Sequence, residues 1–219
     1  MALDGRSPSP SISDLECACL YFAYGSNMNL TQMAQRCPES VIFAKGALCN
    51  YKWQTNSRGG GNVIQGNTED VVHGIVFIIS SSEVEALRRY EGVDKQFFVE
   101  KKLVIELEAI SDPRFSRQKT ADVVKVLATK DSDYGKHTIL ATKRPTSSDE
   151  ICQVETRLSG SHEALVYIST PMYRSPSAIT NEYSRRMQQA IADARLLGLS
   201  EDYLTYTLGP LISRKETDA

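Results

Sequence analysis

The chain has 219 residues, 41% of them hydrophobic, and a formal net charge of −2 at pH 7. This length and composition suffice for one well-buried core with extra segments around it. The sequence contains neither the basic cluster that nucleic acids and anionic membranes select nor an apolar run of the roughly 18 residues that a membrane helix needs. We therefore expect a small molecule or a protein as partner, with no nucleic acid and no membrane.

Cysteine and histidine usage points to a reducing environment without metal. The 5 cysteines include no C-x-x-C pair, and the first residues, Met-Ala-Leu-Asp-Gly-Arg-Ser-Pro, lack an apolar signal core. None of the 3 histidines has a ligand-type spacing to a cysteine. We expect a cytoplasmic protein with no metal site.

The order of elements predicts an α+β fold. Residues 1–14, rich in Ser, Pro and Asp, are expected to form a disordered leader before a single domain over 15–219. Runs of β-branched and aromatic residues predict strands at 19–24, 40–43, 48–55, 72–79, 97–107, 123–128 and 163–169. Helices are predicted at 29–36, 82–90, 179–197 and 201–206, and the apolar periodicity is clearest over 179–197. Such strands with few, segregated helices indicate a strongly twisted or barrel-like antiparallel or mixed sheet.

Residues 111–161 carry two polar stretches, rich in Lys, Ser and Thr, on either side of the predicted strand 123–128. We interpret them as a surface insertion, a kind of segment that commonly adjusts specificity. Another segment, Arg58-Gly-Gly-Gly-Asn62, lacks the register of a phosphate-binding loop and predicts a mobile loop that could act as a lid.

The first candidate for chemistry is the loop Gly25-Ser26-Asn27, at which the apolar run from Cys19 ends. A strand that breaks into small residues presents backbone N–H groups, which can hold a carboxylate or an oxyanion. The same residues are also typical of a plain turn. No G-x-S-x-G elbow surrounds Ser26, so we interpret it as a binding residue and not as a nucleophile.

The second candidate is Glu91. Ser82 and Glu85 fit a capping box, and Gly92 fits the left-handed residue just past a helix, so Glu91 is predicted to end a short helix. The negative end of the helix dipole should raise the pKa of this carboxyl, which suits a group that takes and returns a proton near neutrality. A solvated Glu beside two arginines is the alternative.

Several motifs, taken in order, resemble the γ-glutamylcyclotransferase family over roughly residues 20–208. They are Tyr-Phe-Ala-Tyr-Gly-Ser-Asn at 21–27, Tyr-Glu-Gly-Val at 90–93, Ala-Leu-Val-Tyr-Ile-Ser-Thr at 164–170, Tyr183, and Gly-Leu-Ser-Glu-Asp-Tyr at 198–203. The resemblance implies a small twisted barrel-like mixed sheet with flanking helices, no cofactor, and a monomer or homodimer that acts on a small γ-glutamyl compound.

The resemblance also implies roles for individual residues. Glu91 becomes the catalytic acid/base, and the loop Tyr24, Gly25, Ser26 and Asn27 binds the γ-glutamyl part of the substrate. Tyr167 and Tyr183, which could equally be packed aromatic residues, join the binding pocket. The family often has a tyrosine seven residues after the catalytic Glu, where this chain has Phe98.

The implied reaction is the cyclisation of a γ-glutamyl amine or amide to 5-oxoproline with release of the amine. Two alternatives remain open at this stage. The same chemistry could act on a glutathione conjugate in a biosynthetic or detoxifying pathway, or the chain could be a non-catalytic relative that binds ligands or proteins.

Overall fold

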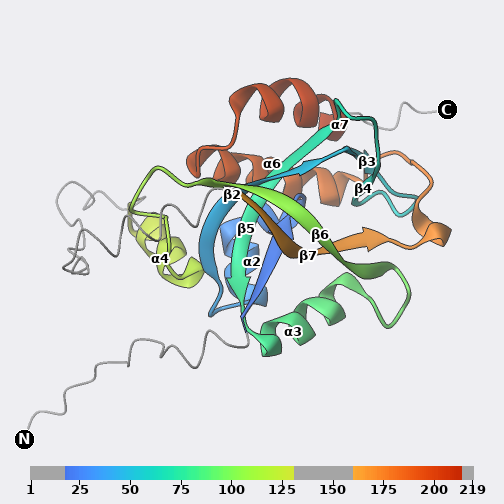
Figure 1. Cartoon of the computed structure of the whole chain (residues 1–219). Coiled ribbons are helices and arrows are strands. Elements are labelled where there is room, and N and C mark those ends of the chain that lie inside the picture. The colour runs from blue at the N-terminus through green and yellow to red at the C-terminus, as the bar shows by residue number, and fades with distance from the viewer. Residues whose placement is uncertain (1–17, 131–159, 214–219) are drawn as a thin grey trace, which may run out of the picture.

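The computed structural model describes residues 18–130 and 160–213 (Figure 1). Its strands β1 (Cys19–Ala23), β2 (Val41–Cys49), β5 (Val71–Ile79), β6 (Phe98–Ala109) and β7 (Gly160–Ser169) form a closed barrel in the order β1-β5-β2-β6-β7. Neighbouring strands are antiparallel except β1 and β7, which pair parallel at Tyr21 and Leu165. The predicted α+β class, with a barrel-like mixed sheet and flanking helices, is confirmed.

Helices surround the barrel (Figure 1). They are α2 (Leu30–Arg36), α3 (Ser81–Glu91), α4 (Thr120–Lys130), α6 (Asn181–Leu196) and α7 (Gly209–Ser213), with short 3-10 turns η1 (Ser26–Met28) and η2 (Pro171–Tyr173). The predicted helix 201–206 continues through a π-helical stretch, η3 (Tyr203–Leu208), into α7. None of the helices in the described ranges is both long and apolar enough to cross a membrane.

The helix caps follow the sequence with one correction. Asn29 and Thr180 cap α2 and α6 with their side chains, so these helices begin one and two residues after the predicted starts at 29 and 179. The predicted capping box of Ser82 and Glu85 is wrong, because Ser80 and Glu83 form it and α3 begins earlier. The Glu83 carboxylate, 5% exposed, accepts the backbone N–H of Ser80 at 2.9 Å and that of Glu39 at 2.8 Å. The additional hydrogen bond from the Glu39 N–H explains why Glu83, and not Glu85, is buried at the start of α3.

The predicted break between strands 40–43 and 48–55 is also wrong. One strand, β2, runs through this region, and the chain turns at Asn50, with φ 62°, into the hairpin of β3 (Tyr51–Thr55) and β4 (Gly61–Gln65). Gly46, which resembles a turn residue in the sequence, lies inside the barrel. A Cβ there would come within 2.8 Å of both Ile105 and Val76, so the narrow interior requires the glycine.

The predicted strand 123–128 is the helix α4. Val123 is buried, and Val124 and Leu127 pack against the core beside it, a spacing that fits a helix face. α4 packs against α2, so tertiary contacts override the strand preference of the β-branched residues. The described start of the expected insertion is thus helical in part. The expected leader 1–14 and residues 131–159 of the insertion lie outside the described residues.

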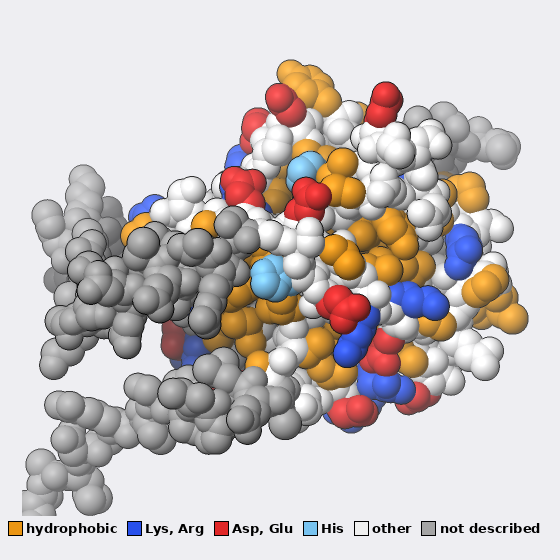
Figure 2. Space-filling model, viewed as in Figure 1, with side chains coloured by type: hydrophobic (Ala, Val, Ile, Leu, Met, Phe, Trp, Pro, Cys, Tyr) orange, Lys and Arg blue, Asp and Glu red, His pale blue; other side chains and the backbone are white. Residues whose placement is uncertain are grey.

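The surface viewed in Figure 2 has charged side chains of both signs intermixed over the region of β6 and α3. An ion pair between Arg88 Nη1 and Glu100 Oε2, 2.6 Å long, joins these two elements. Below the surface, the buried face of α6 contains Tyr183, Met187 and Ile191, as the predicted periodicity requires.

Candidate active site

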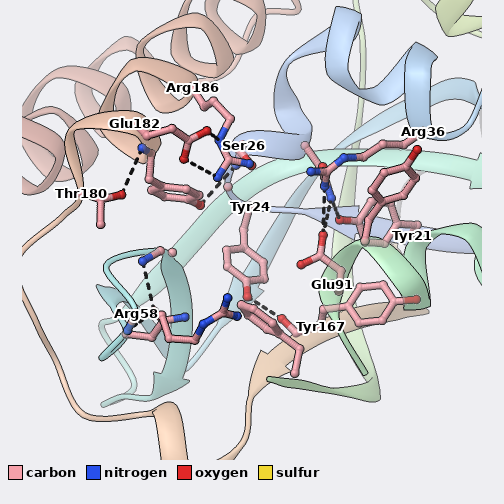
Figure 3. A pocket seen from close by; sticks show the side chains of 18 residues that line it. Tyr21, Tyr24, Ser26, Arg36, Arg58, Glu91, Tyr167, Thr180, Glu182 and Arg186 are labelled. Carbon is pink, nitrogen blue, oxygen red and sulfur yellow. Dashed lines mark hydrogen bonds and ion pairs between the residues drawn. The ribbon is translucent and has the colours of Figure 1, made fainter. Parts of the chain in front are cut away.

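A cavity of about 480 Å³ opens beside the loop that follows β1. Its wall also includes residues from the ends of α2 and α3, the start of α6, the β3–β4 hairpin, and strands β6 and β7; Figure 3 shows many of their side chains. The cavity brings together every site residue expected from the sequence, namely Tyr24, Gly25, Ser26, Asn27, Glu91, Tyr167 and Tyr183. Its volume lies in the range of small-molecule sites.

Glu91 is the last residue of α3, as predicted. Gly92 follows it in the left-handed conformation, with φ 67°, and closes the helix through its N–H. The Glu91 side chain is only 16% exposed, and burial raises the pKa of its carboxyl, while Arg36 and Asn27 oppose the rise. The direction agrees with the sequence argument, and the largest cause of the shift is desolvation.

The side chain of Asn27 holds Glu91 in place. Its Nδ2 donates to Glu91 Oε1 at 3.0 Å and to the Tyr21 hydroxyl at 2.6 Å. Its Oδ1 accepts from Gln32 Nε2 and from Arg36 Nη1, each at 2.8 Å. Because a guanidinium only donates, Oδ1 must face Arg36, which fixes the orientation of the amide. All four hydrogen bonds of the amide are therefore used within the protein.

Arg36 approaches the same carboxylate oxygen. Its Nη1 lies 3.3 Å from Glu91 Oε1, and its guanidinium lies 4.8 Å from the centre of the Tyr90 ring. Within residues 18–130 and 160–213, no hydrogen bond to Glu91 Oε2 is formed. One oxygen of Glu91 is thus anchored and the other is open to the cavity, into which the side chain points in Figure 3.

The Tyr183 hydroxyl lies against the loop backbone. It accepts the N–H of Ser26 at 3.4 Å and also the N–H of Gly61. A Cβ on Gly25 would lie 2.7 Å from this hydroxyl, and one on Gly61 would lie closer still. Gly25 itself has φ −135°, so the close approach of Tyr183, and not a positive φ, requires glycine there. The Ser26 N–H, which we expected to face substrate, faces Tyr183 instead.

Tyr24 and Tyr167 form walls of the cavity. The Tyr24 hydroxyl donates to the carbonyl of Tyr167, and the Tyr167 hydroxyl donates to Glu100 Oε1 at 3.1 Å. The Tyr167 ring packs edge to face against Tyr21, with centroids 5.9 Å apart. Burial raises the pKa of both phenols, so both keep their protons at neutral pH and can donate these hydrogen bonds.

The segment expected to be a mobile loop is an ordered hairpin turn, because Gly61 and Asn62 begin β4. Asn56 Oδ1 accepts the backbone N–H of Arg58 at 3.0 Å and that of Gly60 at 3.1 Å. Arg58 lines the cavity, a position that the sequence did not predict.

The cavity has further residues that the sequence argument missed. Glu182 and Arg186 of α6 form an ion pair of 2.8 Å at its edge. Phe98 lines it without the hydroxyl that a tyrosine would supply. The one available signal was spacing, since Arg186 follows Tyr183 by three residues and Arg36 follows Gln32 by four, each on one helix face. No group of three His, Cys, Asp or Glu side chains that could hold a metal occurs in the described part of the chain.

Comparison with known proteins supports the fold. Neither protein-family models nor curated proteins match the sequence. A solved gamma-glutamyl cyclotransferase is similar, with a TM-score of 0.57 and 18% identity over 92% of this chain and 90% of that one. An uncharacterized protein from Homo sapiens has a TM-score of 0.56 and 19% identity, over 93% of this chain and 91% of its own.

YkqA from Bacillus subtilis is also similar, with a TM-score of 0.55 and 15% identity. That match covers 92% of this chain but 57% of YkqA, so the chain spans little more than half of that protein. At sequence identities this low, the structural matches establish the fold, and any activity has to be inferred from the residues of the site. The chain has the gamma-glutamyl cyclotransferase fold.

Proposed function

We propose that this protein is a γ-glutamylcyclotransferase, which converts a γ-glutamyl amine or amide to 5-oxoproline and releases the amine. The observation that carries the proposal is the state of Glu91, a buried carboxylate anchored at Oε1 and open at Oε2 inside a cavity of about 480 Å³. The fold shared with a gamma-glutamyl cyclotransferase supports the same class of reaction.

The reaction is an internal acyl transfer. The substrate's α-amine attacks its own γ-carbonyl carbon, a new C–N bond closes a five-membered ring, and the C–N bond to the departing amine breaks. The α-ammonium loses two protons on becoming the ring N–H and the departing nitrogen gains two on leaving as an ammonium, so neither water nor an electron carrier is needed. A cavity that holds the substrate folded supplies much of the rate, because ring closure then needs no further loss of freedom.

Glu91 performs both proton transfers in this proposal. Its Oε2 takes one proton from the α-ammonium and gives it to the departing nitrogen, then takes the second proton from the ring nitrogen and passes it to the released amine. Asn27 and Arg36 keep Oε1 fixed throughout. A raised pKa brings the carboxyl closer to neutrality, where a group can both accept and donate a proton efficiently.

Tyr183 stabilises the developing oxyanion in this proposal. Its hydroxyl oxygen accepts two backbone N–H groups, from Ser26 and Gly61, so its own hydrogen is available for the γ-carbonyl oxygen. The two donors polarise the O–H bond and strengthen that hydrogen bond as negative charge forms. This assignment leaves the backbone N–H groups of Gly25 and Asn27 for the α-carboxylate, one of the two substrate groups we expected the loop to bind, because the Ser26 N–H faces Tyr183.

The test is direct detection of 5-oxoproline. Purified protein is incubated with γ-glutamyl dipeptides, glutathione and γ-glutamyl-lysine, and 5-oxoproline is quantified by mass spectrometry, with Glu91→Gln protein as the matched control. We expect release from at least one substrate by the wild type alone. Release from none of them, by a protein that nevertheless binds these ligands, would favour the non-catalytic alternative.

A further inference from the structure

The cavity contains three arginines, two of which face a carboxylate. Arg36 lies 3.3 Å from Glu91, and Arg186 lies 2.8 Å from Glu182. Arg58 makes no ion pair with any residue in the described ranges, although it lines the same cavity. The described lining therefore has one unbalanced positive charge, and Arg58 supplies it.

Aromatic rings hold the Arg58 guanidinium. Its central carbon lies 3.5 Å from the centre of the Phe97 ring and 5.9 Å from that of Tyr173. These two rings pack edge to face, with centroids 5.4 Å apart. Stacking occupies the flat face of a guanidinium and leaves its N–H edge free to donate. Figure 3 shows the Arg58 side chain reaching into the cavity.

The turn that presents Arg58 is fixed on both sides. Asn56, 1% exposed, accepts the Arg58 N–H at 3.0 Å and donates from Nδ2 to Ser169 Oγ at 3.0 Å. The N–H of Ser57 donates to the carbonyl of Tyr173 at 3.0 Å. A cation presented from a fixed turn loses less conformational entropy when it binds an anion than one on a mobile loop.

We propose that Arg58 forms a subsite for a carboxylate carried by the departing amine, so that the protein acts on γ-glutamyl amino acids or peptides in preference to γ-glutamyl amines. This inference rests on the proposed function. The γ-glutamyl group has one α-ammonium and one α-carboxylate, which balance each other. The surplus positive charge of the cavity is therefore complementary to a second carboxylate, which a guanidinium edge binds through two parallel hydrogen bonds.

The experiment uses two ligands that differ only in this carboxylate, γ-glutamyl-alanine and γ-glutamyl-ethylamide. Their dissociation constants are measured by calorimetry on Glu91→Gln protein, which should not consume them. We expect the dipeptide to bind about five- to tenfold more tightly, the range for one charge-assisted contact at a partly solvated site. Added salt should reduce this ratio.

Variants then assign the preference to Arg58. In the Glu91→Gln background, Arg58→Gln should bring the ratio of the two dissociation constants close to one, and Arg58→Lys should retain part of it. Arg89→Gln, which removes an exposed arginine of α3 outside the cavity lining, is the matched control and should keep the full ratio. Equal binding of both ligands by the parent protein, or an unchanged ratio in Arg58→Gln, overturns the inference.

Turnover by the wild type separates this inference from the proposed function. If the dipeptide is preferred through Arg58 but no 5-oxoproline forms from either ligand, the subsite stands and the cyclisation proposal fails. If both ligands are cyclised but bind equally well, the function stands and the subsite fails. Binding of neither ligand overturns both.

Discussion

The side-chain nitrogen of Asn27 lies 3.0 Å from Glu91 Oε1, although 64 positions separate the two residues in the chain. The sheet explains how they meet. β5 runs antiparallel to β1 and ends at Ile79, opposite Cys19 at the start of β1. The 11 residues of α3 then rise roughly 16 Å, about the length of a strand of five residues, and this returns the chain to the end of β1.

This contact makes the role of Glu91 testable. Glu91→Gln keeps the shape and an acceptor oxygen but cannot carry a proton, so turnover should fall by about 10²- to 10⁴-fold. The rate of 5-oxoproline formation measures this loss, and circular dichroism checks the fold. A variant that retains turnover within about threefold of the wild type would remove Glu91 from the mechanism.

The same variant has a second expected effect, on stability. Burial raises the pKa of Glu91 in the folded protein, so ionisation of this residue becomes a cost to folding as the pH rises above the ordinary pKa of a Glu. Glu91→Gln lacks that cost and should have a larger free energy of unfolding than the wild type at pH 8. The difference should disappear as the pH falls toward 4, where the carboxyl is protonated in both states. Urea unfolding at both pH values tests this, and a variant that is less stable at pH 8 contradicts it.

Arg36 should set the pH dependence of activity. Its guanidinium lowers the pKa of Glu91 against the effect of burial. Arg36→Met removes that cation, so the pKa of Glu91 should rise further, and the acid limb of kcat/KM should move to higher pH. Arg88→Met is the matched control, since Arg88 pairs with Glu100 outside the cavity. An acid limb that stays in place or moves to lower pH in Arg36→Met would contradict the assignment.

The contact between Gly25 and Tyr183 predicts a coupling between two substitutions. Gly25→Ala places a Cβ 2.7 Å from the Tyr183 hydroxyl and should destabilise the protein by about 1–3 kcal/mol. Gly25→Val should be worse. Tyr183→Phe removes the hydroxyl, so the double variant should be less destabilised than the sum of the single variants. Chemical denaturation of all four proteins measures the coupling, and simple additivity would show that the crowding is absent.

The parts of the fold that depend on local chemistry could be predicted. Gly92 indicated the end of α3, and the apolar periodicity of α6 placed Tyr183 on its buried face. The strand predicted in place of α4 and the break predicted within β2 were wrong because both depend on tertiary contacts. Whether Val123 lies in a helix or a strand depends on packing against α2, and the need for Gly46 appears only once three other strands close around it.

The candidate site shows the same division. The main-chain turn at residues 25–27 is visible in the sequence, but the side-chain role of Asn27 depends on contacts with Arg36 and Glu91, which are 9 and 64 positions away. The stacking of Arg58 on Phe97 likewise joins a hairpin to the residue before β6. Local patterns contain no signal for such contacts, because strand register and barrel closure bring the residues together.

Asp193 should matter although it lies outside the cavity lining. Its Oδ2 accepts Asn29 Nδ2 and the N–H of Leu30, each at 2.8 Å, so α6 caps the start of α2 from outside. Because α2 carries Gln32 and Arg36, this cap positions the groups that hold Asn27 and, through it, Glu91. Asp193→Ala should lower the free energy of unfolding by about 1–2 kcal/mol, as loss of a helix cap usually does. Asp193→Asn retains an acceptor oxygen and should lose less, and 5-oxoproline formation should follow the same order. If Asp193→Ala is as stable and as active as the wild type, α2 holds its position without this cap.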